Sequence, residues 1–249
     1  MKRKIINGIY RFNKEGKYFM SYSISNSVKN LNNMLNRCKT LKEVYMPSFS
    51  DFKIEKMHNM FNGCVSLEEI TFPRIFNTKY VKDMSNMFSN CESLKHLNLS
   101  SFNTENVENM SQMFQTCESL SEINLSSFNT EKVETMANMF KNCKKLKTIN
   151  LSSFNIKNVS DLSNMFENCD SLQMLDLSSF NIINVSLMIC MFRDCGSLKE
   201  IDLSSFKTSN STKTRDMFLD CVSLKNIKNC SDEKIIKEFN DKSLNIFSN

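Results

Sequence analysis

Ten cysteines are the residues of this chain with the widest chemical repertoire, because thiols form disulfides, bind zinc and act as nucleophiles. Eight of them, from Cys38 to Cys221, follow one another at intervals of 26 residues, with a single interval of 27. So regular a spacing is typical of a repeated structural unit. Equivalent residues of a parallel stack lie about 4.8 Å apart with parallel Cβ vectors, which do not converge for a disulfide. We therefore expect buried free thiols that pack as small apolar side chains.

The other candidates for chemistry form no arrangement that a reaction or a metal ion needs. Cys190 and Cys195 have a C-x4-C spacing, which is a weak zinc signal without a nearby histidine. The two histidines, His58 and His96, are not accompanied by a serine, cysteine or carboxylate in a recognisable catalytic order. Four glycines in the whole chain leave no glycine-rich loop for a phosphate group. The sequence predicts no catalytic residue, no metal site, no cofactor and no enzymatic activity.

Composition and charge exclude further classes of protein. Of the 249 residues 41% are hydrophobic, which is enough for a sizeable core. The net charge of +5 is mild, and its local excess at Lys2-Arg3-Lys4 lacks the clustered stripe of a nucleic-acid-binding protein. The longest apolar run, Leu187–Phe192, is far shorter than the about 20 residues of a membrane-spanning helix. The run Ile5–Tyr10 is too short for a secretory signal, and the C-terminus shows no anchor, so neither is expected.

The regular cysteines belong to a unit of about 26 residues, and its clearest copy is Val107–Lys132. Its first apolar residues recur at intervals of three and four, which predicts one face of a short helix: Val107, Met110, Phe114 and Cys117. Its next apolar residues end in the alternation of a strand: Leu120, Ile123 and Leu125. Such short elements cannot bury their apolar faces alone, whereas stacked copies can. The pattern therefore predicts a solenoid.

These residues carry a family resemblance. Leu120-x-x-Ile123-x-Leu125 matches the strand signature of leucine-rich repeats. The longer string Asn-Met-Phe-x-x-Cys-x-Ser-Leu, followed by Leu-Ser-Ser-Phe-Asn-Thr, resembles the BspA-type leucine-rich-repeat surface proteins over about residues 28–228. Ordinary leucine-rich repeats have an asparagine or cysteine after the strand, where this chain has a phenylalanine such as Phe128. The resemblance implies display at the cell surface and adhesion to host matrix or to other microbes.

The predicted fold class is an α/β repeat solenoid of the leucine-rich-repeat type. Its eight units would place a parallel sheet on one face and short helices on the other. We expect an N-terminal cap over residues 1–27, in which Ile5–Phe12 and Lys17–Ile24 form a β-hairpin. The solenoid would span 28–228, and residues 229–249 would form a C-terminal cap with a short helix. Two capped ends predict a monomer.

The outward-facing strand residues are the candidate partner-binding surface, since side chains alternate across a strand. We take two adjacent columns, a column being the residues at one position of successive units. The candidates are Glu122, Asn124, Thr148, Asn150, Met174, Asp176, Glu200 and Asp202. Three successive asparagines of one column could instead form a side-chain amide ladder with a purely structural role: Asn98, Asn124 and Asn150.

Farther along the same column, Asp176 and Asp202 would place like charges about 4.8 Å apart, with Glu200 beside them. Such a cluster is tolerated when Lys199 or solvent screens it, or when a cation or a basic partner binds. Our hypothesis is that this acidic end of the strand face is the binding surface.

Two candidate functions from different classes follow. The first is a non-enzymatic protein-binding module, displayed at the cell surface or secreted, whose partner is a host-matrix or microbial surface protein. The alternative is a cytoplasmic scaffold that organises protein partners, because free thiols suit a reducing compartment and no signal peptide is expected.

Overall fold

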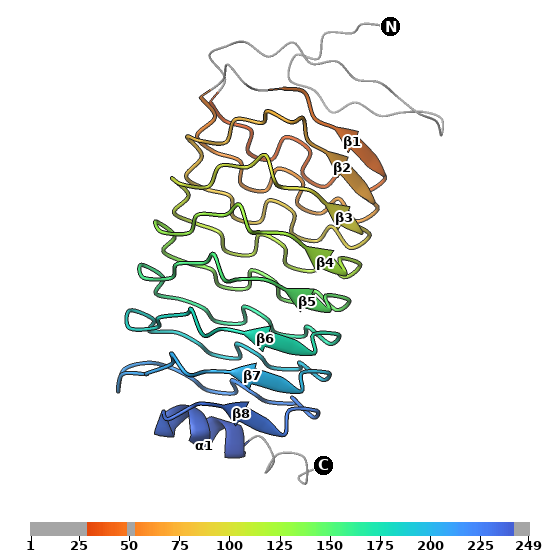
Figure 1. Ribbon diagram of the computed structural model, residues 1–249. Coiled ribbons are helices and arrows are strands. Elements are labelled where there is room, and N and C mark those ends of the chain that lie inside the picture. Colours follow the sequence, from red (N-terminus) through yellow and green to blue (C-terminus); the bar gives the residue numbers. More distant parts are fainter. Residues whose placement is uncertain (1–28, 49–52, 242–249) are drawn as a thin grey trace, which may run out of the picture.

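The computed structural model describes residues 29–48 and 53–241. The chain winds through successive coils that stack on one another, so that the N-terminal and C-terminal parts lie at opposite ends of the stack (Figure 1). The predicted N-terminal hairpin lies outside the described residues, as do residues 242–249. The predicted repeat solenoid with a parallel sheet on one face is confirmed.

Each coil contributes one short strand to the same side of the stack (Figure 1). The strands are β1 (Glu43–Tyr45), β2 (Glu69–Thr71), β3 (His96–Leu97), β4 (Glu122–Ile123), β5 (Thr148–Ile149), β6 (Met174–Asp176), β7 (Glu200–Asp202) and β8 (Asn226–Lys228). All pairs are parallel, and they form three ladders: β1-β2-β3, β4-β5 and β6-β7-β8. The register follows the repeat, since Val44 pairs with Ile70 and Leu175 with Ile201. Equivalent residues of successive units therefore lie side by side on one face.

The prediction of short helices on the opposite face is wrong. The segment from Val107 to Cys117 contains turns and an isolated parallel bridge between Asn109 and Thr135 of the next coil. Two of its residues, Gln112 and Thr116, have positive φ angles of 58°. Left-handed residues at these positions prevent a right-handed helix. The apolar residues of the segment are buried as predicted, but two consecutive turns, not a helix, bring them to the core.

Hydrogen bonds between coils explain why the turns are preferred. The Gln112 N–H donates to the carbonyl of Ala137 at 2.9 Å, and the Thr116 N–H donates to Lys141 at 2.7 Å. Both acceptors lie in the next coil, whereas a helix would direct these groups to residues four positions earlier. Asparagine and aspartate adopt the left-handed region more readily than most residues. They accordingly fill most of the equivalent positions in other coils: Asn33, Asn59, Asn86, Asn90, Asn138, Asn142, Asn164, Asn168, Asp194, Asp216 and Asp220.

Stacked phenylalanines form the centre of the core. Seven rings, one per coil, lie at the same position of successive units: Phe61, Phe88, Phe114, Phe140, Phe166, Phe192 and Phe218. Neighbouring ring centroids are 5.4–5.9 Å apart, and the planes are inclined by 5–15°. All seven are fully buried. Because each ring contacts the rings before and after it, the stack sets a common spacing for the coils.

One helix, α1 (Glu233–Asp241), follows the last strand and lies across that end of the stack (Figure 1). Asp232 accepts the Ile235 N–H at 3.1 Å, which caps the helix N-terminus. Ile235 is fully buried, and the Phe239 ring meets the last ring of the stack, Phe218, edge-on at 6.0 Å. The helix thus covers apolar surface at the C-terminal end. The division of the chain at residues 28 and 229 stays a prediction.

Substitution of Asn138, whose φ is 60°, distinguishes the left-handed turn from a helix. We expect Asn138→Gly to be nearly neutral, whereas Asn138→Ala should lower the free energy of unfolding by about 1–2 kcal/mol because alanine is strained there. In a helix the order would be reversed, since alanine is favoured over glycine by roughly 1 kcal/mol. Urea unfolding measures the difference. Ala137→Gly is the matched control and should show the ordinary preference for alanine. An Asn138→Ala variant more stable than Asn138→Gly would contradict the turn.

The strand face as a candidate binding surface

The eight predicted binding residues lie on strands β4–β7 or directly after them, on one surface that we call the strand face. The structure places three pairs side by side: Glu122 with Thr148, Met174 with Glu200, and Asp176 with Asp202. Six of the eight side chains are exposed, and Glu200 and Asp202 are half-buried. β5 and β6 belong to different ladders, so Thr148 and Asn150 have no register partner on β6.

The asparagine and aspartate side chains at the ends of these strands have a local structural role. The side chain of Asn124 accepts the N–H of Ser126 at 3.0 Å, and Asn150 accepts that of Ser152 at 3.0 Å. Each such Asx turn closes the loop that follows its own strand. The alternative of an amide ladder is not borne out for Asn124 and Asn150: in the described part of the chain their amides bond within their own coil and not to each other.

Asp176 and Asp202 make the same turns with a charged acceptor. Asp176 accepts the Ser178 N–H at 2.9 Å, and Asp202 accepts the Ser204 N–H at 2.8 Å. Hydrogen bonding with the side chains of Ser178 and Ser204, and then with their backbone N–H groups, lowers the pKa of both carboxyls below the ordinary value. The pKa of Asp202 is lowered further by Asn229, whose amide donates to its second oxygen at 2.7 Å, and by the nearby Lys228. Both groups thus remain ionised despite their mutual repulsion.

Glu200 completes what we call the acidic end, formed by Asp176, Glu200 and Asp202. The Glu200 carboxylate pairs with the Lys228 ammonium group of the next coil. Lys228 therefore partly offsets the charge, whereas Lys199, which the sequence suggested as the screening residue, is not in an ion pair with the cluster in the described part of the chain. The acidic end keeps an excess of negative charge on the strand face.

Two exposed apolar side chains also lie on the strand face. Tyr45 at the end of β1 is 71% exposed, and Met174 at the start of β6 is 62% exposed. Met174 was predicted as a site residue, but Tyr45 was not included, although it lies in the column that contains Asn124 and Asp176. The alternation of strand residues marked Tyr45 as outward-facing, and this signal was sufficient to find it.

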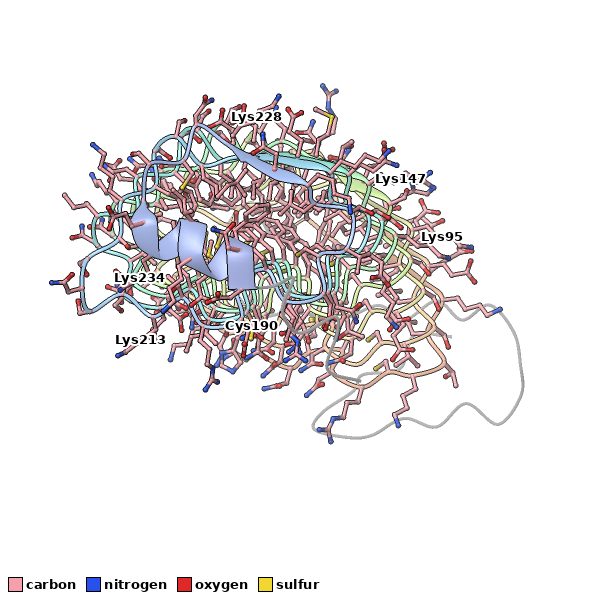
Figure 2. The ribbon with its side chains drawn as sticks, turned by 90° about the horizontal axis from the view of Figure 1, so that it is seen from below. Lys95, Lys147, Cys190, Lys213, Lys228 and Lys234 are labelled. Carbon is pink, nitrogen blue, oxygen red and sulfur yellow. The ribbon has the colours of Figure 1, made fainter. Side chains whose placement is uncertain are left out.

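A shallow groove of about 340 Å³ lies at the other end of the strand face. It is lined by Lys42, Glu43, Glu68, Glu69, Lys95 and His96. Lys95 and Glu68 form an ion pair of 2.8 Å across neighbouring coils, which lowers the pKa of Glu68. Figure 2 shows Lys95 and Lys147 on the side of the strands, and Cys190 and Lys213 on the opposite side. The groove is open and of mixed charge, so it offers a polar contact area and not an enclosed cavity.

The cysteines of the repeat point into the core, as predicted. Each thiol from Cys64 to Cys221 in this column donates to a carbonyl of the preceding coil; Cys143, for example, donates to Phe114 at 3.2 Å. Burial raises the pKa of Cys143 to about 12. Such thiols are poor nucleophiles and poor metal ligands. Within residues 29–48 and 53–241, no group of three or more cysteine, histidine or acidic side chains is arranged to hold a metal ion.

The positions of the two histidines and of Cys190 are explained by the repeat and not by a catalytic or metal-binding arrangement. His58 Nδ1 lies 3.2 Å from the Asp83 carboxylate of the next coil, and His96 lies outward on β3. Cys190 occupies a left-handed position with a φ of 55°, and burial raises the pKa of its thiol.

Among the described residues there is no helix with the length and apolar content of a membrane span.

Sequence comparison places the repeat in a family. The family described as "Mycoplasma protein of unknown function, DUF285" matches residues 5–96, 29–149, 56–174 and 145–241, which together cover most of the chain. The chain belongs to this family. The overlapping matches reflect the 26-residue repeat, on which the family model can be placed in several registers. No curated protein sequence gives a significant match.

Solved structures that resemble this DUF285 chain are leucine-rich-repeat proteins. A leucine rich cell surface protein from Faecalibacterium prausnitzii is 18% identical, with a TM-score of 0.40 over 89% of this chain and 68% of that one. A leucine rich repeat protein of T. pallidum is 17% identical, with a TM-score of 0.31 over 80% of this chain and 61% of that one. One from Bacteroides ovatus is 17% identical, with a TM-score of 0.27 over 79% and 63%. The chain spans less than two thirds of the last two.

Acid should weaken this DUF285 solenoid through its two turn-capping aspartates. Their pKa values are lowered by folding, so their stabilisation is complete above the ordinary value of 3.8 and is lost as the pH falls through the lower folded values. The combined variant Asp176→Asn and Asp202→Asn keeps the acceptors but does not titrate. We expect its melting temperature to fall less than that of the wild type between about pH 6 and about pH 3. Thermal unfolding followed by circular dichroism measures this.

The matched control is Asn124→Asp, which introduces a titrating acceptor into the equivalent turn. It should increase the loss of melting temperature in acid. Equal losses in the wild type, the double variant and the control would contradict a stabilising role for the ionised carboxyls.

Proposed function

We propose that this protein is a non-enzymatic binding module that recognises another protein through its strand face. The observation that carries the proposal is the contrast between columns. Core columns repeat one residue type, such as the phenylalanines and cysteines, whereas the first outward strand column changes chemically from coil to coil: Glu43, Glu69, His96, Glu122, Thr148, Met174, Glu200 and Asn226. A rigid frame that presents a varied, exposed surface is how solenoids bind extended partners.

We place the main contact at the acidic end of this surface, next to the exposed Met174. The lowered pKa values keep Asp176 and Asp202 charged at neutral pH. The exposed Met174 lies beside carboxylates, so a matching partner would have an apolar side chain surrounded by basic residues. The partner class is therefore a protein with a basic surface.

For the cellular role we propose surface display and adhesion to host-matrix or microbial surface proteins. The repeat motif supports this through its resemblance to BspA-type surface proteins. A cytoplasmic scaffold is the second candidate, which the free thiols favour. Their burial weakens that argument, however, because thiols such as Cys117 and Cys143 are fully buried and shielded from oxidants in either compartment.

The charge at the acidic end can be tested without disturbing the fold. Lysine at Asp176 or Asp202 would remove the acceptor of the turn, whereas asparagine retains it and removes only the charge. Wild-type protein on a resin captures partners from a matrix extract and from a lysate of the source cells, and the affinity of each purified partner is then measured. We expect Asp176→Asn and Asp202→Asn each to weaken binding by about 2- to 5-fold, with a reduced salt dependence.

The matched control is Asn124→Asp with Asn150→Asp, which extends the acidic column and should strengthen binding of the same partner. Affinities that are equal in all variants for every captured partner would contradict the acidic end as the contact. If Met174→Asp were the one variant to lose binding, the contact would lie on the apolar part of this surface, at Met174.

Cellular location separates adhesion from the scaffold. We expect antibodies against the protein to label intact cells of the source organism, because an adhesin must be accessible from outside. Labelling of intact cells is compared with labelling of permeabilised cells, and an antibody against a cytosolic protein controls for leakage. Labelling that requires permeabilisation would contradict adhesion and favour the scaffold.

A further inference from the structure

The side of the stack opposite the strands, which we call the back face, carries a polar column with one apolar member. Isolated parallel bridges join equivalent residues of successive coils there, and Figure 2 shows one of them, Lys213, on the side away from Lys95 and Lys147. The column consists of Asn30, Lys56, Asp83, Asn109, Thr135, Asp161, Leu187 and Lys213. Leu187 is thus apolar at a position that the other coils keep polar or charged.

Ile189 makes the same coil apolar at the next outward position. Met188 is fully buried, so the side chains on either side of it, Leu187 and Ile189, point outward. At the position of Ile189 the neighbouring coils have Ser163 and Arg215. Leu187 and Ile189 are both half-buried, and neither belongs to the apolar side chains that pack against the core in the described part of the chain. Core packing therefore does not explain these two residues, which we call the apolar pair.

The charges on either side of the apolar pair have opposite signs. One coil earlier the column has Asp161, and one coil later it has Lys213. Within residues 29–48 and 53–241 neither of them forms an ion pair, whereas Arg215 pairs with Asp216 at 3.4 Å. An acidic group, the apolar pair and a basic group therefore follow one another along the stack.

We propose that two copies of this chain associate through their back faces at the coil that contains β7, with their stacks antiparallel. A two-fold axis that lies in the interface and crosses this coil places the apolar pair of one copy on that of the other. It also reverses the order of the coils, so that Asp161 of each copy faces Lys213 of the other. A surface that complements itself in this way is what a two-fold interface requires.

The charges select the antiparallel arrangement. Parallel stacks would place Asp161 opposite Asp161 and Lys213 opposite Lys213, and like charges that face each other across an interface repel. The same pattern favours a second copy over an unrelated protein, because the chain already carries the complementary surface.

This contact leaves the strand face free, since the two faces lie on opposite sides of the stack (Figure 2). The dimer presents one strand face on each outer side, and one dimer can therefore join two partner molecules. The monomer expected from the sequence was argued from the ends of the stack, whereas this contact lies on its side. The dimer does not depend on which protein the strand face binds.

Sedimentation velocity of the full chain over a range of concentrations measures the association. We expect the mass to rise from the 28.9 kDa of one chain toward twice this value. The combined variant Leu187→Asn and Ile189→Ser should weaken the dimer by at least about 10-fold, because the apolar contact is lost. The fold should tolerate both changes, since Asn109 and Ser111 occupy these positions in the coil of β4.

Charge reversal tests the pairing. Lys213→Asp and Asp161→Lys each place like charges opposite each other, so each variant alone should dimerise about 10-fold more weakly or worse. In an equimolar mixture of the two variants opposite charges face each other again, and association should return to the wild-type level. Recovery would also show that both variants are folded. Lys56→Asp, in the same column but near the other end of the stack, is the matched control and should leave the dimer unchanged.

Three results would overturn the proposal. A wild-type protein that stays monomeric up to about 0.5 mM would leave the apolar pair to a different protein. A dimer that is unaffected by Leu187→Asn with Ile189→Ser would have its contact on another surface. Single charge variants that dimerise like the wild type, or a mixture that does not recover, would contradict the pairing of Asp161 with Lys213.

Discussion

The spacing between stacked coils is the constraint on which the rest of this structure depends. No coil holds an element that is stable alone, since its strand has two or three residues and its turns contain left-handed positions. Stability comes from contacts between coils, in which one phenylalanine ring stacks on the next at 5.4–5.9 Å. Such contacts require the same residue at the same position of every coil, and this explains the fixed unit of 26 residues.

The single unit of 27 residues shows how this spacing is preserved when the length changes. Phe72 occupies the core position that Leu99 fills in the next unit, and its ring contacts Phe76 and Phe102 at 4.9 Å. The extra residue is accommodated in the loop after it, where Ile75 is 67% exposed. The insertion thus lies at the surface, and the phenylalanine stack continues through this coil without a break.

The strand face is subject to two separate requirements. In one column, the asparagine or aspartate of five successive coils, from Asn98 to Asp202, accepts an N–H of the following turn, so part of the acidity at Asp176 and Asp202 has a structural origin. In the adjacent column no such bond restricts the side chain, and Met174 is as acceptable as Glu200. Chemical variety therefore concentrates in the column that the fold leaves free, and this supports its assignment as a recognition surface.

The sequence by itself determined the repeat, the buried columns, the strand positions and the outward direction of the predicted site residues, because burial and alternation are local patterns. It did not distinguish a helix from two successive turns, since intervals of three and four residues bury the same side chains in both. The asparagines at the left-handed positions were the available signal, and their identity became interpretable only with the backbone in view. The tertiary structure decided the matter through hydrogen bonds such as that from Gln112 to Ala137. These join residues one coil apart, and no pattern within a single unit specifies them.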